Sequence, residues 1–191
     1  DVTYPFFPVG TGKFVALSIC SFGLYELYWC YKNWQRIRDR SGESISPFWR
    51  AAFAPIWCFR LFETIQVQSR VHSLRGGGKP ASRSWSGDGL ATLYLILSIV
   101  PSLPMIPDPW SLISIFTFLA FLPVLGTTRE VNESVLSIEN QNTKLTRLNL
   151  VVLLAGGLLV LFGVIGMFLP ETQNPIPASS DVLAGLPFTA K

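Results

Sequence analysis

Long uncharged stretches alternate with short basic ones along this chain. Between Asp88 and Arg129 the only charged residue is Asp108, and no charge occurs between Arg147 and Glu171. A transmembrane helix needs about 20 predominantly apolar residues to cross the hydrocarbon layer. The pattern therefore predicts an all-α, polytopic membrane protein with four transmembrane helices. The predicted spans are residues 13–34, 88–106, 109–126 and 147–169.

The segment 47–68 is rich in aromatic residues but also carries Arg50, Arg60 and Glu63. Each arginine inside a spanning helix would cost about 2.5–3.5 kcal/mol on insertion scales. Both flanks of the segment are basic, whereas the two ends of a span are expected to differ in charge. The pattern predicts an interfacial or re-entrant helix, which leaves the charged groups at the lipid headgroups.

Basic residues cluster in the loops on either side of this segment, and they set the predicted topology. The positive-inside rule places such loops in the cytoplasm, facing anionic headgroups. It then places both chain termini on the non-cytoplasmic side, with residues 1–12 as an aromatic lead at the interface. Residues 127–147 are predicted to be cytoplasmic, and 170–191 to be an extended or disordered tail. The clustered basic residues are Lys32, Arg36, Arg38, Arg40, Arg70, Arg75, Lys79 and Arg83.

The stretch from Gly23 to Trp34 reads GLYELYWCYKNW and combines aromatics with one carboxylate. Four positions recur at helical spacing and share a face. They are Glu26, Cys30, Asn33 and Ile37. Glu26 either sits near headgroup depth within an aromatic belt, or faces the protein interior and pairs with an arginine, because intramembrane carboxylates are expensive. Gly23, beside Ser21, marks a bend or a close-packing point.

Two further local patterns concern helix ends and helix packing. Ser46 followed by Pro47 predicts a helix start, and Asn142 or Thr143 is predicted to cap the last helix. The last helix carries glycines that predict close packing against another helix, preferably one of the same chain. These glycines are Gly156, Gly163 and Gly166.

The composition is typical of a membrane protein, and it provides few of the residues that catalytic or metal sites need. Hydrophobic residues make up 49% of the chain and charged residues 14%, with a net charge of +3. The three cysteines form no CxxC pair, and His72 is the only histidine. Zinc sites and Ser-His-Asp triads need more partners than this. We expect no enzyme activity, no metal or cofactor and no nucleic-acid partner, and we expect the cysteines to be buried small hydrophobes.

Two sequence segments resemble a known group of proteins. The stretch SFGLYELYWCYKNWQRIR, followed by SPFWRAAFAPIWCFRLF, is similar to the opening of uncharacterised bacterial inner-membrane proteins with a glycine-tyrosine-tryptophan-tyrosine-lysine-asparagine signature. The resemblance covers about residues 13–62, with weaker similarity in PDPW and at the start of the last helix. It implies a bacterial inner-membrane location and assigns no catalytic residue.

Two functions fit these expectations. The first is a non-catalytic accessory or scaffold subunit that contacts membrane lipids and packs against other integral membrane proteins. The second is a small channel or carrier for an ion or lipid. Its polar pocket would be formed by Glu26, Arg50, Arg60 and Glu63, the charges placed in apolar, aromatic sequence.

Overall fold

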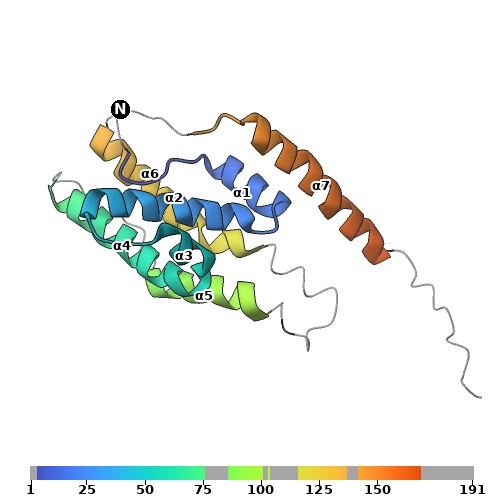
Figure 1. The fold of residues 1–191 in the computed structure, drawn as a ribbon, viewed down its shortest axis with the longest axis horizontal. Coiled ribbons are helices and arrows are strands. Elements are labelled where there is room, and N and C mark those ends of the chain that lie inside the picture. Colours follow the sequence, from blue (N-terminus) through green and yellow to red (C-terminus); the bar gives the residue numbers. More distant parts are fainter. Residues whose placement is uncertain (1–3, 76–85, 101–102, 104–115, 137–141, 169–191) are drawn as a thin grey trace, which may run out of the picture.

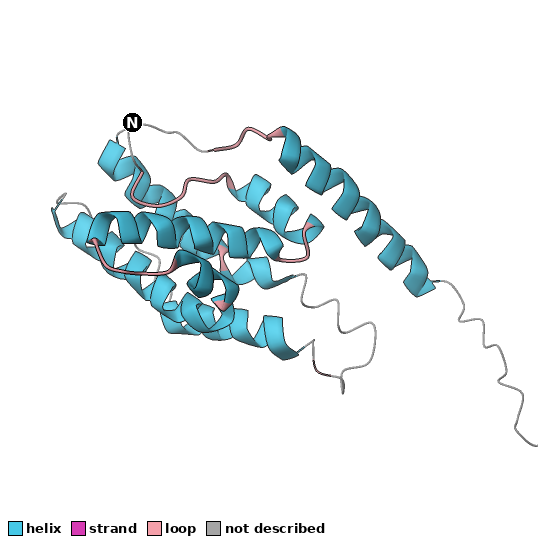
Figure 2. Ribbon diagram, viewed as in Figure 1, coloured by secondary structure: helices cyan, strands magenta, loops and turns pink. Residues whose placement is uncertain are grey.

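The computed structural model describes residues 4–75, 86–100, 103, 116–136 and 142–168, and every regular element in these ranges is helical (Figure 2). The all-α prediction is therefore confirmed. Helices α1–α6 form a bundle, and α7 lies along one side of it and extends past it (Figure 1). The helices are α1 (Thr11–Cys20), α2 (Leu24–Ser41), α3 (Pro47–Ala52), α4 (Ala54–Arg75), α5 (Gly87–Ile99), α6 (Leu122–Leu136) and α7 (Arg147–Phe168).

The segment predicted as one span over residues 13–34 is broken into two helices, α1 and α2. Phe22 and Gly23 have positive φ values of 52° and 84°. The Gly23 N–H donates to the Ser18 carbonyl over 2.9 Å, which closes α1 with a helix C-terminal turn. The Ser21 hydroxyl then accepts from the Tyr25 N–H at 2.9 Å, satisfying a free donor at the start of α2. The bend predicted at Ser21 and Gly23 is a complete chain reversal.

Helices α1 and α2 pack against each other as a helical hairpin (Figure 1). The ring of Phe14 lies 5.8 Å from that of Tyr25 and 6.1 Å from that of Trp29. With 10 residues, α1 is about 15 Å long at 1.5 Å per residue, half the thickness of the hydrocarbon layer. The single helix predicted over 13–34 is therefore corrected to two helices that reverse direction at residues 21–23.

The start of α1 lies beside the segment that leads into α7. The Lys13 ammonium donates to the Lys144 carbonyl at 2.7 Å and to the Asn142 side-chain oxygen at 3.0 Å. The predicted topology puts Lys13 outside and residues 127–147 in the cytoplasm, which these contacts contradict. The last helix is capped by Thr146, whose hydroxyl accepts from the Asn149 N–H at 3.3 Å, and not by Asn142 or Thr143. Asn142 is instead used to hold Lys13.

The segment 47–68 forms α3 and the first part of α4. Helix α3 begins at Pro47 with Ser46 as N-cap residue, as predicted, although the Ser46 side chain makes no capping hydrogen bond. The break falls at Phe53, two residues before Pro55, whose ring and missing N–H do not fit a helix interior. Helix α4 then runs to Arg75 and packs against α5.

Aromatic rings from five parts of the chain meet at Phe121. Its ring centroid lies between 4.9 and 5.7 Å from those of Phe14, Trp29, Phe62 and Tyr94, which come from α1, α2, α4 and α5. Three of these contacts are edge-on, and contacts of this kind add to the large apolar area that aromatic side chains bury. Helices α1, α2, α4 and α5 thus share one contact residue, which lies just before α6.

The N-terminal segment also enters this bundle. The Asn132 side chain accepts from the Phe6 N–H and donates to the Phe6 carbonyl, at 2.9 and 3.0 Å. The Asn33 side-chain oxygen accepts from the Phe7 N–H at 3.0 Å. Phe6 is fully buried, so this residue of the lead predicted for the membrane interface belongs to the protein core.

Helix α7 contains the one stretch of the described residues, Arg147–Gly166, that is long and apolar enough to cross a membrane. Only 6% of this stretch is buried. The predicted spans 88–106 and 109–126 lie partly outside the described residues, and the tail 170–191 lies wholly outside them. In the described part of the first of these spans lies α5, which has 13 residues. Helix α6 starts within the last residues of the second span, at Leu122.

Candidate functional site

Glu26 lies in the interior of the bundle, with a side chain that is 1% exposed. The Thr117 hydroxyl donates to the Glu26 carboxyl over 2.7 Å. The other residues of the predicted face, Cys30, Asn33 and Ile37, are also buried, so the shared face is confirmed. Of the two alternatives for Glu26, the structure shows the interior one, with a hydroxyl as its partner in place of an arginine.

Arg50 is held between aromatic rings. Its guanidinium carbon lies 4.4 Å from the ring centre of Trp34 and 4.5 Å from that of Trp57. Cation–π contacts of this kind contribute about 0.5–2 kcal/mol each, depending on how far the cation is desolvated. Because the two rings belong to α2 and α4, Arg50 joins α3 to both neighbours.

Arg60 and Glu63 form an ion pair of 3.1 Å on the outer face of α4. Their side chains are 68% and 54% exposed, so the pair is solvated and worth little. The structure thus brings Arg60 and Glu63 together and gives Glu26 and Arg50 other partners. The four residues predicted to line a polar pocket occupy three separate environments.

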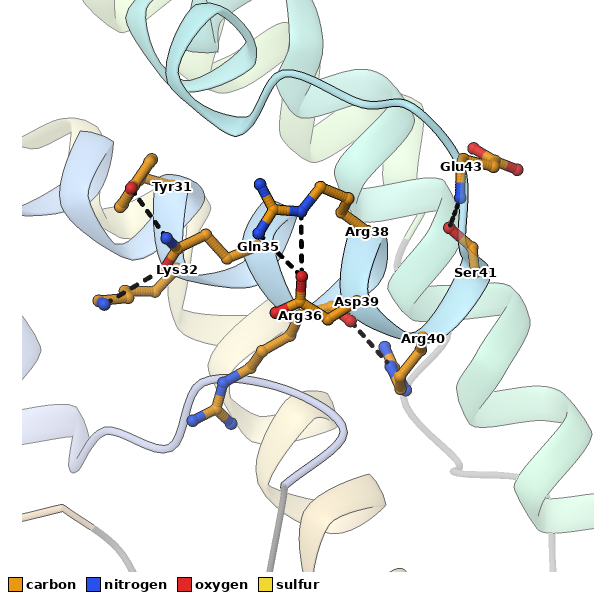
Figure 3. A network of polar contacts seen from close by, with 9 residues as sticks. All are labelled: Tyr31, Lys32, Gln35, Arg36, Arg38, Asp39, Arg40, Ser41 and Glu43. Carbon is orange, nitrogen blue, oxygen red and sulfur yellow. Dashed lines mark hydrogen bonds and ion pairs between the residues drawn. The ribbon is translucent and has the colours of Figure 1, made fainter.

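The basic residues of α2 divide between outward and inward roles (Figure 3). Arg38 pairs with Asp39 at 2.8 Å on the exposed side. Arg36 points to the N-terminal segment, where its guanidinium donates to the Tyr4 and Phe6 carbonyls. The same group lies over the ring of Phe7. Burial, together with the nearby Arg40 guanidinium, lowers the pKa of Arg36 from its usual value.

The other predicted surface cations have mixed positions. Lys32 lies 5.8 Å from the ring centres of Tyr28 and Tyr31. The Arg40 guanidinium carbon lies 5.2 Å from the ring centre of Phe6. Arg70 is exposed near the C-terminal end of α4. The Arg75 side chain, Lys79 and Arg83 lie outside what the structure describes.

The glycines of α7 have unlike surroundings. A Cβ on Gly156 would lie 1.7 Å from the Cys20 carbonyl oxygen, so the two backbones touch there. Nothing lies within 4 Å of a Cβ placed on Gly163 or Gly166 among the described residues. The packing predicted for these glycines, against a helix of the same chain, is shown at Gly156, which meets α1.

A groove of about 540 Å³ runs between the α1–α2 hairpin and α7. Its wall includes Lys13 and Asn149 near the start of both helices, and Leu24, Ala155 and Leu159 farther along. The sequence gives little sign of it, because its sides come from segments more than 100 residues apart. A groove of this volume is large enough to bind a small molecule.

Metal-binding chemistry has no geometric basis in the described ranges. Cys30 and Cys58 are buried and Cys20 is half-buried, and all three are free thiols. No three His, Cys, Asp or Glu side chains among the described residues lie close enough together to hold a metal ion. No protein-family profile, no curated protein and no solved structure significantly resembles this chain, so the residues and their geometry carry the functional argument.

Proposed function

We propose that this chain is a non-catalytic integral membrane protein that serves as an accessory or scaffold subunit. The observation that carries the proposal is the exposed apolar surface of α7. From Leu161 to Gly166 every residue of α7 is exposed, and none of the described elements covers this part. Exposed apolar surface on this scale is typical of contact with lipid or with another protein.

The bundle fits a position partly immersed in the same membrane. Exposed apolar side chains occur at the α1–α2 turn, on α3 and at the end of α5, and also on the last turns of α4. Aromatic and apolar groups of this kind collect at the boundary between lipid and water. Examples are Phe22, Leu24, Phe48, Trp49, Ile96 and Ile99. The basic ends of α2 and α4 lie at the opposite end of the bundle, where they would face anionic headgroups (Figure 1).

Further parts of the proposal go beyond this arrangement. A bacterial inner membrane is the location implied by the resemblance of residues 13–62. Additional spans within 88–106 and 109–126 would complete a polytopic protein. The starts of α1 and α7 lie beside each other, and we assign both to the same side of the membrane as the basic ends of α2 and α4. We place that side in the cytoplasm.

The surface around Gly163 and Gly166 is our candidate for contact with another membrane protein. Small residues allow a second transmembrane helix to approach closely, and these two positions have open space around them. The carrier alternative receives no such support, because its four pocket residues do not share a site.

Co-purification from native membranes in a mild detergent tests the proposal. We expect a second membrane protein at a fixed ratio with the wild type, and its loss from the Gly163→Leu variant. Val164→Leu, a conservative change at an exposed neighbour, should retain the partner. A wild-type protein that purifies alone would remove the scaffold function. A Gly163→Leu variant that retains its partner would show that the partner binds elsewhere than at Gly163 and Gly166.

A further inference from the structure

The groove between the α1–α2 hairpin and α7 is polar at one end and apolar at the other. Helices α1 and α7 begin side by side, as the Lys13 contacts with Asn142 and Lys144 show. They still touch at Cys20 and Gly156, about two turns later. The groove wall changes over the same distance from Lys13 and Asn149 to the apolar side chains of Leu24 and Leu159.

The polar end carries a positive charge that the described residues do not neutralise. Lys13 is only 9% exposed, and both of its hydrogen-bond acceptors are uncharged. None of the ion pairs in the described part of the chain includes it. An ammonium has three donors, so one remains for a further acceptor. A buried charge is costly unless it is paired, which favours an anion at this end.

The groove as a whole has the length of a lipid chain. From Thr146 to Leu159 the groove follows α7 for roughly 20 Å at 1.5 Å per residue, somewhat more than the roughly 15 Å of one hydrocarbon leaflet. A small soluble anion would occupy the lysine end and leave this apolar wall uncovered. An amphipathic molecule with a negative headgroup covers both ends at once.

We propose that this groove binds one anionic phospholipid of the surrounding leaflet. Its phosphate accepts a hydrogen bond from the Lys13 ammonium, and one acyl chain lies between the hairpin and α7. The proposal rests on the membrane location in the proposed function, but not on the existence of a protein partner. The lipid would fill the space beside the Gly156 contact and so help to hold α7 against α1.

Binding of a defined lipid to the purified protein tests the charged end. Phosphatidylglycerol or phosphatidylcholine is added to the protein in mild detergent, and the bound lipid is counted by native mass spectrometry. We expect one tightly held phosphatidylglycerol, with affinity at least about tenfold lower in Lys13→Met, which loses a charge-assisted hydrogen bond. Lys144→Met is the matched control: the Lys144 side chain is exposed and its carbonyl is retained. Equal binding by Lys13→Met and Lys144→Met would overturn the proposal.

A second pair of variants tests the apolar end and guards against misfolding of Lys13→Met. Val152 lines the groove, whereas its neighbour Val151 is exposed on another face of α7. Val152→Trp should fill the groove and displace the lipid, and Val151→Trp should leave binding unchanged. Equal binding by the two tryptophan variants, equal affinity of the wild type for the two lipids, or displacement by millimolar inorganic phosphate would each contradict a lipid site.

The outcomes separate this proposal from the scaffold function. A wild type that retains phosphatidylglycerol but no protein partner supports the lipid site and removes the scaffold role. A wild type that retains a partner but no phosphatidylglycerol does the reverse.

Discussion

The bundle buries its large apolar side chains, whereas most of helix α7 leaves them exposed. In the bundle, Phe121 is 0% exposed and touches rings from four helices. On α7, Phe162 is 60% exposed and lies where no described element covers the helix. The bundle is therefore stabilised by its own packing, whereas α7 depends on its contact with α1 and on what surrounds it. The two regions should respond very differently to the same substitution.

The largest expected difference comes from removing one phenylalanine from each region. Phe121→Ala should lower the free energy of unfolding by about 3–5 kcal/mol, because it leaves a cavity where five rings meet. Phe162→Ala should change it by less than about 0.5 kcal/mol, as is usual for exposed positions. Thermal or denaturant unfolding in detergent measures both. Similar effects of the two changes would mean that α7 is packed as tightly as the bundle.

Next in size is the effect of adding one methyl group to α7. Gly156→Ala places a Cβ against the Cys20 backbone, so α7 must shift away from α1. We expect a loss of about 1–3 kcal/mol, typical of overpacking. Gly163→Ala meets open space and should be neutral or slightly stabilising in a helix. The same unfolding assay compares them, and a harmless Gly156→Ala would show that the two helices do not touch there.

A smaller difference in the free energy of unfolding is expected between alanine substitutions at two arginines of the bundle. Arg50→Ala removes a cation held between Trp34 and Trp57 and should cost about 1–2 kcal/mol. Arg60→Ala breaks an exposed pair with Glu63 and should cost less than about 1 kcal/mol. Unfolding midpoints distinguish the two. A larger loss from Arg60→Ala would indicate that the pair has a role that its exposure hides.

The smallest effect is expected at Glu26. Glu26→Gln keeps an acceptor for the Thr117 hydroxyl and removes a carboxyl whose charge would be costly in the interior. The stability should change by less than about 1 kcal/mol. Glu26→Ala is the control, since it removes the acceptor and leaves a cavity, and should cost distinctly more. Strong destabilisation by Glu26→Gln would show that the negative charge itself is needed.

The first and last predicted spans show which helices the sequence could predict. The predicted span 147–169 is uncharged from Leu148 for 22 residues, and its described part, Arg147–Phe168, is one helix of spanning length. In 13–34, the uncharged run from Phe14 to Tyr25 has only 12 residues, short of the roughly 20 that a span needs. Ser21 and Gly23 signalled the turn, but periodicity cannot tell a bend from a reversal.

Contacts between distant segments were beyond the sequence. The Glu26 face followed from helical spacing, whereas its partner Thr117 is 91 residues away. The predicted span begins at Lys13, and nothing in the local sequence indicates that its ammonium is held by a carbonyl 131 residues later. The sequence marked Arg50 and Arg60 equally, and only packing places one between tryptophans and the other in solvent.

The central claim is that α1 begins beside the start of α7, so that we expect the α1–α2 hairpin not to cross the membrane. A Cβ on Gly10 would lie 3.7 Å from that of Thr143, within the range of about 3.5–4.5 Å found in disulfides. Gly12 has no neighbour within 4 Å and provides the control.

Oxidation of the paired cysteine variants in membranes, followed by mass spectrometry of the linked peptides, makes the test. We predict that Gly10→Cys with Thr143→Cys forms a disulfide in most molecules, and that Gly12→Cys with Thr143→Cys does not. A folded Gly10→Cys/Thr143→Cys protein that stays reduced, with the two cysteines labelled from opposite sides of the membrane, would contradict the hairpin and restore a single span over residues 13–34.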